Sequence, residues 1–496
     1  MFDTILIANR GEIALRVVRT CREMGIRTVV VHSTADRDSA AVRAADESVQ
    51  IGPAAPRRSY LSAPAILEAA IATGAQAVHP GYGFLSEDPD FAEICAANGL
   101  VFIGPPPDVM ARLADKSVAR AEMTACGLPL LPGSNGTVDS VADAAELAGR
   151  IGYPVIIKAV AGGGGRGMSV VRDPRHLAHA YRVTRATAQS IFGDGRVYLE
   201  RFCDRARHVE VQVLADRYGN VVHLGERDCS VQRRHQKLVE EAPAPNLSAS
   251  LRAEMAAAAV RGARGVGYVG AGTFEFVVSD DQFYFMEVNC RIQVEHPVTE
   301  MVTGIDLVRE QIRVAAGLVL RHEQAELAPR GVSLECRVNA EDPARDFAPT
   351  AGLLTRFVPP GGPFTRIDTH AYEGWRVTSD YDSLLAKVVV WAPDRKQAIA
   401  RMDRALAEFH IAGHGVRTTI PVLRQVLADG QFATGEHSTD LIARLPVPPA
   451  AARAAHDDKD RHDRTRHDAA TVRHGFPARS VPGAGGPAAT GAGARD

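Results

Sequence analysis

The chain has 496 residues, of which 46% are hydrophobic and 23% are charged, and its formal net charge is -2 at pH 7. Such a chain is too long for one hydrophobic core, so we expect roughly two to four domains. The near-neutral charge gives no general reason to expect nucleic acid or an anionic membrane as a partner, and no apolar run approaches the roughly 20 residues of a membrane helix.

The N-terminus and the cysteines indicate where the protein works. Residues 1–11 lack the basic region, apolar segment and small-residue cleavage site of a secretory signal, and they are typical of a first strand and turn. The 7 cysteines are scattered without a Cys-x-x-Cys pair, which favours free thiols over disulfides or structural zinc. We therefore expect a cytoplasmic protein.

Lysine is rare, because most of the 57 basic side chains are arginine. The lysines are Lys116, Lys158, Lys237, Lys387, Lys396 and Lys459. A lysine kept in such a background can mark a place that requires a compact ammonium in place of a planar guanidinium. The first three fall beside other signals of a site, whereas chance explains Lys396 and Lys459.

The first segment alternates strands and helices. Residues 4–8 form an apolar strand, helical spacing runs from Ile13 to a stop at Gly25, and residues 28–32 form the next strand. This opening predicts a parallel sheet with covered faces. It lacks Gly-x-Gly-x-x-Gly, so a dinucleotide site is not supported.

A glycine-containing loop follows the strand at residues 75–79. Residues 80–87 read Pro-Gly-Tyr-Gly-Phe-Leu-Ser-Glu, at the end of a parallel strand where such sheets place ligands. A tight structural turn is an equally good alternative. After the strand at residues 101–104, we expect Asp108 to cap a helix that bears Lys116 and ends near Gly127.

A run of glycines separates two further strands. The strand at residues 153–158 ends at Lys158, residues 162–167 are glycines interrupted only by Arg166, and residues 169–171 form the next strand. Backbone N–H groups of consecutive glycines can close over phosphate oxygens, and Lys158 supplies a point charge. No Gly-Lys-Ser/Thr closes the run, so we predict a phosphate-binding flap that is not a Walker A loop.

Polar and apolar residues alternate from residue 208 onward. The polar set is His208, Glu210 and Gln212, and the apolar set is Val209, Val211 and Val213. We expect the polar face to join residues of the following loop, namely Glu226, Gln232, His235 and Lys237. The stretch 227–237 is strongly basic, and we interpret Arg227 and Arg234 as solvated charges on that loop.

Residues 273–289 have the pattern of a β-hairpin, because two alternating apolar runs flank the polar residues 279–282. If the turn is centred on Asp281, Glu275 lies across from Glu287, and Val277 across from Phe285. Facing carboxylates are destabilising unless a cation lies between them, and Mg2+ or Mn2+ prefers such oxygen ligands. A register slipped by one residue, with one Glu facing solvent, is the alternative.

The polar pattern continues beyond the hairpin. Asn289 adds a third oxygen ligand, and then a cation, an amide and a carboxylate alternate at Arg291, Gln293 and Glu295. A metal site, an anion-binding arginine and a candidate base in one stretch predict activation of a small oxyanion with a nucleoside triphosphate.

The C-terminal third begins with a helix predicted from His296 through Ile312. The strand at residues 333–338 places Arg337 in an apolar run, where it either pairs with Glu335 or another acid or faces a site; we favour the site. Further strands include residues 384–391, and residues 393–408 are expected to be helical. From about residue 447 large apolar residues almost vanish, which predicts a disordered tail.

Several of these motifs, in one order, resemble the biotin carboxylases of the ATP-grasp superfamily. The match covers Ile-Ala-Asn-Arg-Gly-Glu at 7–12, residues 79–87, the glycine run, Glu-Arg-Asp-Cys-Ser at 226–230, Gln-Arg-Arg-His-Gln-Lys at 232–237, Glu-Val-Asn at 287–289 and Asp-Ser at 382–383. It extends over almost everything up to residue 446.

The resemblance implies an α/β fold with a doubly wound parallel sheet at its start and an α+β extension at its end. The implied parts are an N-terminal domain (1–115), a connecting helical segment (116–131), an ATP-grasp lid with the glycine flap (132–202), an ATP-grasp body with the metal and bicarbonate site (203–330), a C-terminal domain (331–446) and the tail (447–496).

The resemblance also implies residue roles. ATP would contact Lys116, Lys158, Gly164, Gly165, Glu200, Arg201, Phe202, Cys203, His208, Gln232 and His235. Mg2+ or Mn2+ would be held by Glu275, Glu287 and Asn289. Bicarbonate would contact Lys237, Arg291, Gln293 and Val294, Glu295 would be the base, and Arg337 would face biotin.

The implied activity is ATP-dependent carboxylation of biotin with bicarbonate through carboxyphosphate. No Met is followed by Lys, so a Met-Lys-Met biotin-acceptor sequence is absent. We therefore expect a separate biotin carboxyl carrier protein and a carboxyltransferase subunit as partners in an acyl-CoA carboxylase, and the family implies a homodimer.

The sequence also leaves other functions open. The alternatives are the corresponding subunit of a pyruvate carboxylase and another ATP-grasp ligase that joins a carboxylate to an amine. A non-catalytic nucleotide-binding subunit is disfavoured, because the site lysines, arginines and acids are all present. Cys290 stands where relatives more often have Thr or Pro, and its thiol predicts sensitivity to oxidation.

Overall fold

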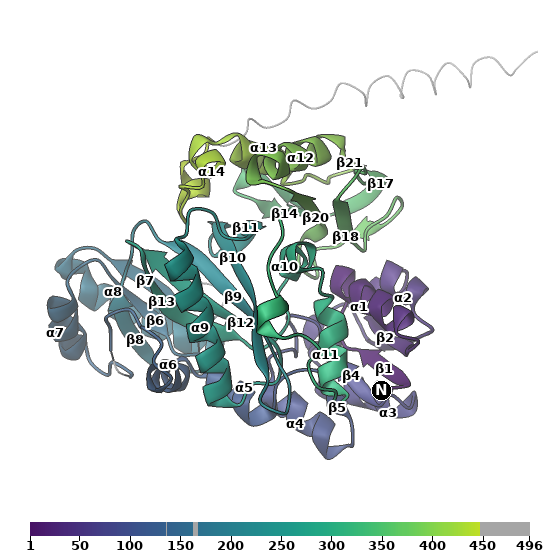
Figure 1. The fold of residues 1–496 in the computed structure, drawn as a ribbon, viewed down its shortest axis with the longest axis horizontal. Coiled ribbons are helices and arrows are strands. Elements are labelled where there is room, and N and C mark those ends of the chain that lie inside the picture. Colours follow the sequence, from purple (N-terminus) through teal and green to yellow (C-terminus); the bar gives the residue numbers. More distant parts are fainter. Residues whose placement is uncertain (135, 162–166, 447–496) are drawn as a thin grey trace, which may run out of the picture. The chain divides into compact units, whose positions relative to one another are not determined.

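Five parallel strands form the first sheet of the computed structural model, which describes residues 1–134, 136–161 and 167–446 (Figure 1). Their order is β3-β2-β1-β4-β5, so the chain moves outward from β1 and then returns to its other side. The strands are β1 (Thr4–Ile7), β2 (Arg27–Ser33), β3 (Glu47–Gly52), β4 (Ala77–His79) and β5 (Val101–Phe102). The predicted doubly wound sheet is confirmed.

Helices cover both faces of this sheet because strand residues alternate between two cores. Ile5 and Ile7 pack with residues of α1, whereas Leu6 packs with residues of α3 and α4. The helices of this part are α1 (Gly11–Glu23), α2 (Ala40–Ala44), α3 (Ala63–Ala72) and α4 (Pro89–Ala97).

The helix that bears Lys116 begins later than predicted. Two helices, α5 (Pro107–Ala114) and α6 (Lys116–Ala125), replace the single predicted one. Asp115 separates them: its backbone is extended, and its side chain accepts hydrogen bonds from the backbone N–H groups of Ser117 and Val118. An N-cap needs a non-helical backbone, so Asp115 caps the helix, and the prediction of Asp108 is wrong.

A small antiparallel sheet of order β7-β6-β8 carries Lys158. Alternate residues Val155 and Ile157 enter a core with Tyr181, which leaves Lys158 on the other face. The elements are β6 (Val155–Ala159), β7 (Met168–Val171), β8 (Val197–Arg201), α7 (Val141–Ile151) and α8 (Leu177–Phe192). Most of the predicted glycine flap, residues 162–166, lies outside the described residues.

An eight-stranded antiparallel sheet of order β13-β12-β9-β10-β11-β14-β20-β18 forms the centre of the fold (Figure 1). β11 pairs with β14, so this one sheet crosses the predicted boundary at residue 330. Its strands are β9 (Arg207–Ala215), β10 (Val221–Arg233), β11 (Gln236–Ala242), β12 (Gly270–Ser279), β13 (Gln282–Asn289), β14 (Val332–Asn339), β18 (Thr365–Thr369) and β20 (Leu384–Ala392). The long helix α9 (Ala249–Val266) packs on β9 and β10.

The segment predicted as a basic loop after residue 226 is part of this sheet. β10 and β11 join at a tight turn in which Arg234 and His235 have φ angles of 49° and 66°. Arg227 has no exposed surface, so its interpretation as a solvated charge is wrong. Arg234 is exposed, as predicted.

The helix predicted from His296 through Ile312 is also two helices, α10 (His296–Thr303) and α11 (Leu307–Ala315). Gly304 closes the first in a left-handed conformation, and Asp306 caps the second by accepting a hydrogen bond from the backbone N–H of Arg309. A glycine stop followed at once by an aspartate cap defines a break.

The C-terminal part packs helices on the far strands of the large sheet. Its remaining elements are β15 (Glu341–Asp342), β16 (Ala348–Pro349), β17 (Gly352–Val358), β19 (Arg376–Val377), β21 (His410–Gly413), α12 (Arg395–Glu408), α13 (Ile420–Ala428), α14 (Gly430–Thr434) and α15 (Leu441–Arg444). Met402 and Leu406 of α12 enter one core with Val388 of β20. The tail predicted to be disordered, 447–496, lies outside the described residues.

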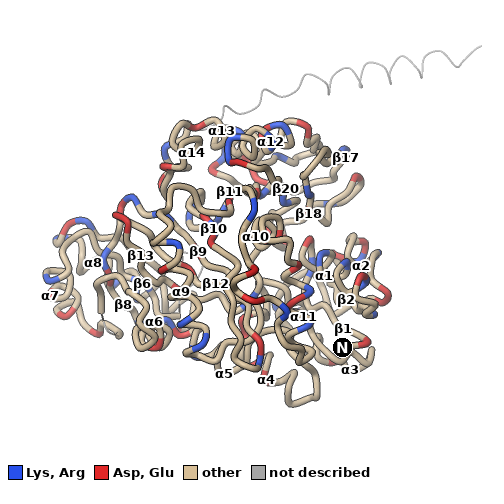
Figure 2. Tube along the Cα trace, in the orientation of Figure 1, with Lys and Arg blue, Asp and Glu red and all other residues tan. Residues whose placement is uncertain are grey.

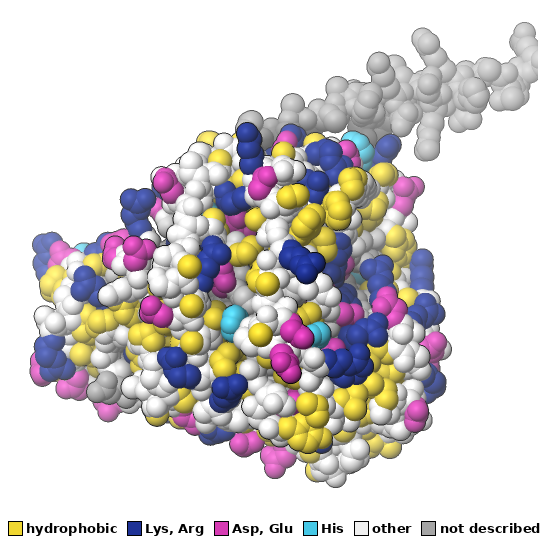
Figure 3. All heavy atoms as spheres, viewed as in Figure 1, with side chains coloured by type: hydrophobic (Ala, Val, Ile, Leu, Met, Phe, Trp, Pro, Cys, Tyr) yellow, Lys and Arg dark blue, Asp and Glu magenta, His cyan; other side chains and the backbone are white. Residues whose placement is uncertain are grey.

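Charges of both signs are spread along the described elements. Figure 2 shows acidic and basic residues interspersed on the trace, and on the face in Figure 3 they alternate with hydrophobic side chains. None of the helices in the described parts is long and apolar enough to span a bilayer.

Candidate active site

One cavity of about 910 Å³ is bordered by the loops that follow β1 and β4, by the small sheet of β6, β7 and β8, by the large sheet and by Glu341 of β15. The first domain contributes Tyr82, the small sheet contributes Lys158, and the large sheet contributes Lys237, Glu275 and Arg337. Residues that are far apart in the sequence therefore meet at one site.

The hairpin of β12 and β13 places Glu275 directly opposite Glu287, as predicted. The register differs nearer the turn, where Val277 pairs with Tyr284 and not with Phe285. The turn itself has two residues, Asp280 and Asp281, both with positive φ. A bulge at Met286, between the turn and the two glutamates, adds one residue to β13 and brings Glu275 opposite Glu287.

Glu275 accepts hydrogen bonds from several donors in the cavity. Its carboxylate lies 3.0 Å from Lys237 Nζ and 3.1 Å from His208 Nε2, and Asn289 Nδ2 donates to it at 2.8 Å. Burial opposes ionisation, but Lys237 and His208 outweigh it and hold the pKa of Glu275 well below its usual range. Glu275 is therefore an anion at neutral pH.

The three predicted metal ligands border the same cavity. Glu287 pairs with Lys116, and Asn289 Oδ1 accepts a hydrogen bond from Arg291. Two carboxylates and an amide oxygen are a donor set that Mg2+ or Mn2+ prefers, so these residues fit such an ion.

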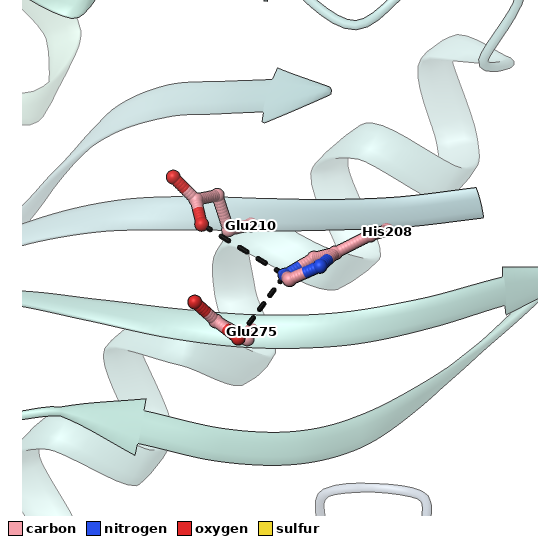
Figure 4. Close-up of side chains that lie close together, drawn as sticks. All are labelled: His208, Glu210 and Glu275. Carbon is pink, nitrogen blue, oxygen red and sulfur yellow. Dashed lines mark ion pairs between the residues drawn. The ribbon is translucent and has the colours of Figure 1, made fainter. Parts of the chain in front are cut away.

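Another acidic cluster lies beside the predicted ligands. Figure 4 shows His208 and Glu210 of β9 and Glu275 of β12 turned toward one another, and their ligand atoms lie within 4.8 Å. Glu210 has no exposed surface and binds both Lys237 Nζ, at 2.7 Å, and Arg227 Nε, at 2.5 Å. Cations thus already neutralise Glu210.

Arg227, which the sequence interpretation placed on a solvated loop, is a buried residue behind the cavity. Its guanidinium donates to Gln212 at 2.7 Å, to Thr299 at 3.0 Å and to Thr273 at 3.1 Å, in addition to its bond with Glu210. The pairing of β9 with β10 sets Arg227 opposite Glu210, and knowledge of this pairing would have indicated that Arg227 is buried. The same pairing sets Glu226 opposite Val211, so Glu226 faces α9 and pairs with Arg252, and its predicted place beside the site is wrong.

Glu295 is fully buried between two cations. Its Oε1 lies 2.5 Å from Lys237 Nζ, and its Oε2 accepts a hydrogen bond from Arg337 Nη2 at 2.8 Å. Burial opposes the charged form, but Lys237 and Arg337 outweigh it and hold the pKa of Glu295 well below its usual range. Glu295 is an ionised carboxylate that can accept a proton. The sequence left two alternatives for Arg337, an ion pair or a position that faces a site. Arg337 pairs with Glu295 and also borders the cavity.

Arg291 is held by the loop that follows β4. Glu87 accepts a hydrogen bond from Arg291 Nε at 2.9 Å, and Gln293 Oε1 accepts one from Nη1 at 2.8 Å. The loop at residues 80–87 is thus more than a tight turn, because Tyr82 also borders the cavity. Its hydroxyl donates to Glu12, which pairs with Lys387.

The described residues among the predicted nucleotide contacts lie at the same cavity. Lys158 pairs with Glu200, which also accepts a hydrogen bond from Arg120 at 2.8 Å. The cavity is bordered by Lys116, Lys158, Glu200, Arg201, Phe202, Cys203, His208, Gln232, His235, Gln293 and Val294. Gly164 and Gly165 lie outside the described residues, so their predicted contacts with phosphate stay predictions.

The thiol of Cys290 is poorly placed for oxidation. Its side chain is buried, and burial raises the pKa of the thiol. Because the thiolate is the reactive form, both features oppose the predicted sensitivity. All 7 cysteines are free, in agreement with the sequence analysis.

Comparisons with known proteins agree with this geometry. Residues 1–110 match the family model of the biotin carboxylase N-terminal domain, residues 115–323 that of the carbamoyl-phosphate synthase L chain ATP-binding domain, and residues 335–444 that of the biotin carboxylase C-terminal domain. Together these models span most of the chain.

Individual relatives are similar to this chain over nearly their whole length. A biotin carboxylase of Nostoc sp. is 53% identical over 445 residues, which are 90% of this chain and 99% of that protein. A crystal structure of a Campylobacter jejuni biotin carboxylase complex with β,γ-ATP has a TM-score of 0.87 and 46% identity, covering 90% of this chain and 99% of that one.

Another similar structure contains a nucleotide and bicarbonate. The biotin carboxylase domain dimer of Hydrogenobacter thermophilus 2-oxoglutarate carboxylase, in complex with MgADP and bicarbonate, has a TM-score of 0.86 and 45% identity, covering 89% of this chain and 97% of that one. On the family models, the identities and the site geometry together, the chain belongs to the biotin carboxylase family.

Proposed function

We propose that this chain uses ATP and bicarbonate to carboxylate biotin on a separate carrier protein, as the first half-reaction of an acyl-CoA carboxylase. The observation that carries this proposal is Glu295, an ionised and buried carboxylate held by Lys237 and Arg337 beside the Glu275 side of the cavity. A base between two cations suits an anionic substrate that must lose a proton before it reacts.

Substrate binding would use the remaining charges of the cavity. Lys237, Arg291 and Gln293 would hold bicarbonate, while Lys116 and Lys158 would approach the phosphates of ATP. Glu275, Glu287 and Asn289 would hold Mg2+ or Mn2+, which neutralises phosphate charge and aligns the γ-phosphorus when bound.

The first chemical step would convert bicarbonate into an electrophile. Glu295 takes the proton of bicarbonate, the freed oxygen attacks the γ-phosphorus, and ADP leaves, which yields carboxyphosphate. Once Glu295 is protonated it holds Lys237 and Arg337 less strongly, since its charge is gone. Arg337 Nη2 then becomes available to anions in the cavity, whereas Lys237 stays bound to Glu210 and Glu275.

The second step would transfer the carboxyl group. Carboxyphosphate breaks down to carbon dioxide and phosphate, the released phosphate takes the proton of the ureido nitrogen of biotin, and that nitrogen attacks the carbon dioxide. Arg337 Nη2, released from Glu295, would stabilise the negative charge on the ureido oxygen.

The partners and setting follow from this chemistry. A biotin carboxyl carrier protein would supply biotin, and a carboxyltransferase subunit would set the final acceptor. The 2-oxoglutarate carboxylase relative supports the alternative of a keto-acid carboxylase, such as a pyruvate carboxylase, with the same half-reaction. That relative's dimer supports a homodimer, and the free cysteines support a cytoplasmic location.

The test is ADP release measured with bicarbonate, with and without free biotin. We expect biotin to stimulate turnover, and we expect Glu295→Gln and Arg337→Ala to lose that stimulation. Lys396→Gln, at an exposed position of α12, is the matched control. Turnover that is insensitive to biotin, or that requires an amine acceptor, would favour another ATP-grasp ligase.

A further inference from the structure

Two buried carboxyl groups lie behind Arg337. Glu240 of β11 and Glu335 of β14 are cross-strand partners, and neither side chain is exposed. Glu240 Oε1 accepts a hydrogen bond from Arg337 Nε at 2.5 Å. Among the described residues, the other oxygen of Glu240 and both oxygens of Glu335 have no hydrogen-bond partner. Two buried negative charges in this arrangement would destabilise each other, so the pair must retain a proton.

The charges that face the pair come from several elements. They are Lys237 of β11, Glu295 before α10, Arg337 of β14 and Lys387 of β20, with the thiols of Cys229 and Cys336 nearby. Glu240, Glu295 and Glu335 therefore share these cations. Lys237 is in addition bound by Glu210 and Glu275.

The two carboxyl groups differ in their hold on a proton. Burial raises the pKa of Glu240 to about 7, against the opposing effect of Arg337. Burial also raises the pKa of Glu335 well above its usual range, and Glu240 adds to that shift while Lys387 opposes it. Glu335 thus keeps the proton, and Glu240 ionises first.

We propose that Glu240 is a positioning residue for Arg337 in the biotin-dependent step, and that a protonated Glu335 behind it permits Glu240 to ionise. This inference rests on the proposed function. When Glu295 takes the bicarbonate proton, its hold on Arg337 Nη2 weakens, and Glu240 becomes the remaining anionic anchor of the guanidinium. Ionised Glu240 keeps Nε fixed, so the Nη groups can turn to the ureido oxygen without loss of orientation.

The site would carry two activities that depend on Arg337 to different degrees. ATP cleavage with bicarbonate alone does not need Arg337 on a ureido oxygen, whereas biotin carboxylation does. Loss of the Glu240 charge should therefore slow only the second activity. The same reasoning predicts that biotin-dependent turnover falls as the pH drops below about 7, because Glu240 is then protonated and binds Arg337 less strongly.

The experiment uses the full chain and compares ADP release with bicarbonate, with and without saturating free biotin, between about pH 6 and 9. Glu240→Gln removes the charge and keeps the shape. Glu241→Gln is the matched control, because Glu241 is the next residue of the strand, is equally buried, and pairs with Arg395 at 2.7 Å outside the site. Glu335→Gln mimics the neutral acid.

We expect Glu240→Gln to lower the biotin-dependent kcat/KM by about tenfold or more and to abolish its acidic limb, while biotin-free ATP cleavage changes by less than about twofold. Glu241→Gln should leave the ratio of the two activities unchanged. Glu335→Gln should retain both activities, and it should lack an infrared band of a protonated carboxyl group that the parent shows at about pH 9, where Glu240 is ionised.

Equal loss of both activities in Glu240→Gln, or an unchanged acidic limb, would overturn the inference. So would a parent without that infrared band. If Glu240→Gln fails to fold, the two pH profiles and the infrared spectrum of the parent still decide, because identical acidic limbs with and without biotin contradict the proposal. A parent that biotin does not stimulate would instead overturn the proposed function.

Discussion

Arg227 Nε lies 2.5 Å from Glu210 Oε1, and neither side chain has any exposed surface. Glu210 is also bound by Lys237, whose ammonium reaches Glu275 and Glu295 at 3.0 Å and 2.5 Å. Arg227 therefore gives Glu210 a cation of its own, beside the lysine that Glu210 shares with Glu275 and Glu295. A buried pair of this kind is costly to break, because the partner left behind keeps an uncompensated charge.

Replacing Arg227 by Met should lower the free energy of unfolding by about 3–5 kcal/mol, since Glu210 would be buried with one cation fewer. Denaturant titration of the two proteins measures the difference. Arg234→Met is the control, because Arg234 is exposed and its loss should not change stability measurably. Equal stability of Arg227→Met and the parent would contradict the buried pair.

Lys237→Gln should shift the pH dependence of ATP cleavage. Burial works against the ionisation of Glu295, and Lys237 is the strongest charge that favours it. Without Lys237 the pKa of Glu295 rises, so the acidic limb of the rate profile should move to higher pH, with a lower maximal rate. Profiles of kcat/KM for bicarbonate measure the limb, and an unmoved limb would argue against Glu295 as the base.

Glu287→Gln should weaken the dependence of ATP cleavage on divalent ions, because one of two facing carboxylates loses its charge. We expect the Mn2+ concentration for half-maximal rate to rise by about tenfold or more. Direct Mn2+ binding by electron paramagnetic resonance separates a lost ligand from a lost catalytic group. Glu47→Gln is the control, because Glu47 is an exposed acid that pairs with Arg27. Unchanged Mn2+ binding in Glu287→Gln would contradict the assigned ligand.

His79→Gln should reduce the loss of stability in mild acid. Burial lowers the pKa of His79 to about 3, whereas an unfolded histidine has a pKa of about 6.5. The unfolded chain thus binds a proton that the folded chain refuses, so this contribution is fully present above about pH 6.5 and is lost as the pH falls toward about 3.

The measurement is the free energy of unfolding at several pH values within that range. Removal of His79 should lessen the slope by up to about 1.4 kcal/mol per pH unit. His414→Gln, at an exposed position, should leave the slope unchanged. An identical slope in His79→Gln and the parent would show that His79 does not titrate as the burial predicts.

Alternation along single strands carried the sequence predictions furthest. It placed Glu275 opposite Glu287, and it separated His208 and Glu210 from the valines of the same strand. The pairing nearer the turn was not predictable, because the extra residue at Met286 leaves the alternation of neighbouring residue types undisturbed. A bulge is visible only in the ladder of two strands.

Tertiary contacts account for the predictions that failed. Arg227 looks like an exposed charge in a basic run, but its partners Glu210 and Thr299 come from distant segments that the run does not announce. The helix breaks at Asp115 and Asp306 depend on cap hydrogen bonds that override a continuing apolar pattern. Residue type indicates what a side chain can do, whereas its partners decide whether it is buried.

The most direct measurement follows the oxygen atoms of bicarbonate. If the cavity activates bicarbonate with ATP, bicarbonate labelled with heavy oxygen should pass one labelled oxygen to each phosphate released in the presence of biotin, because the bridging oxygen of carboxyphosphate comes from bicarbonate. Glu295→Gln should release little phosphate and little label. Phosphate whose new oxygen comes from water, at the full rate and with no bicarbonate label, would contradict the account.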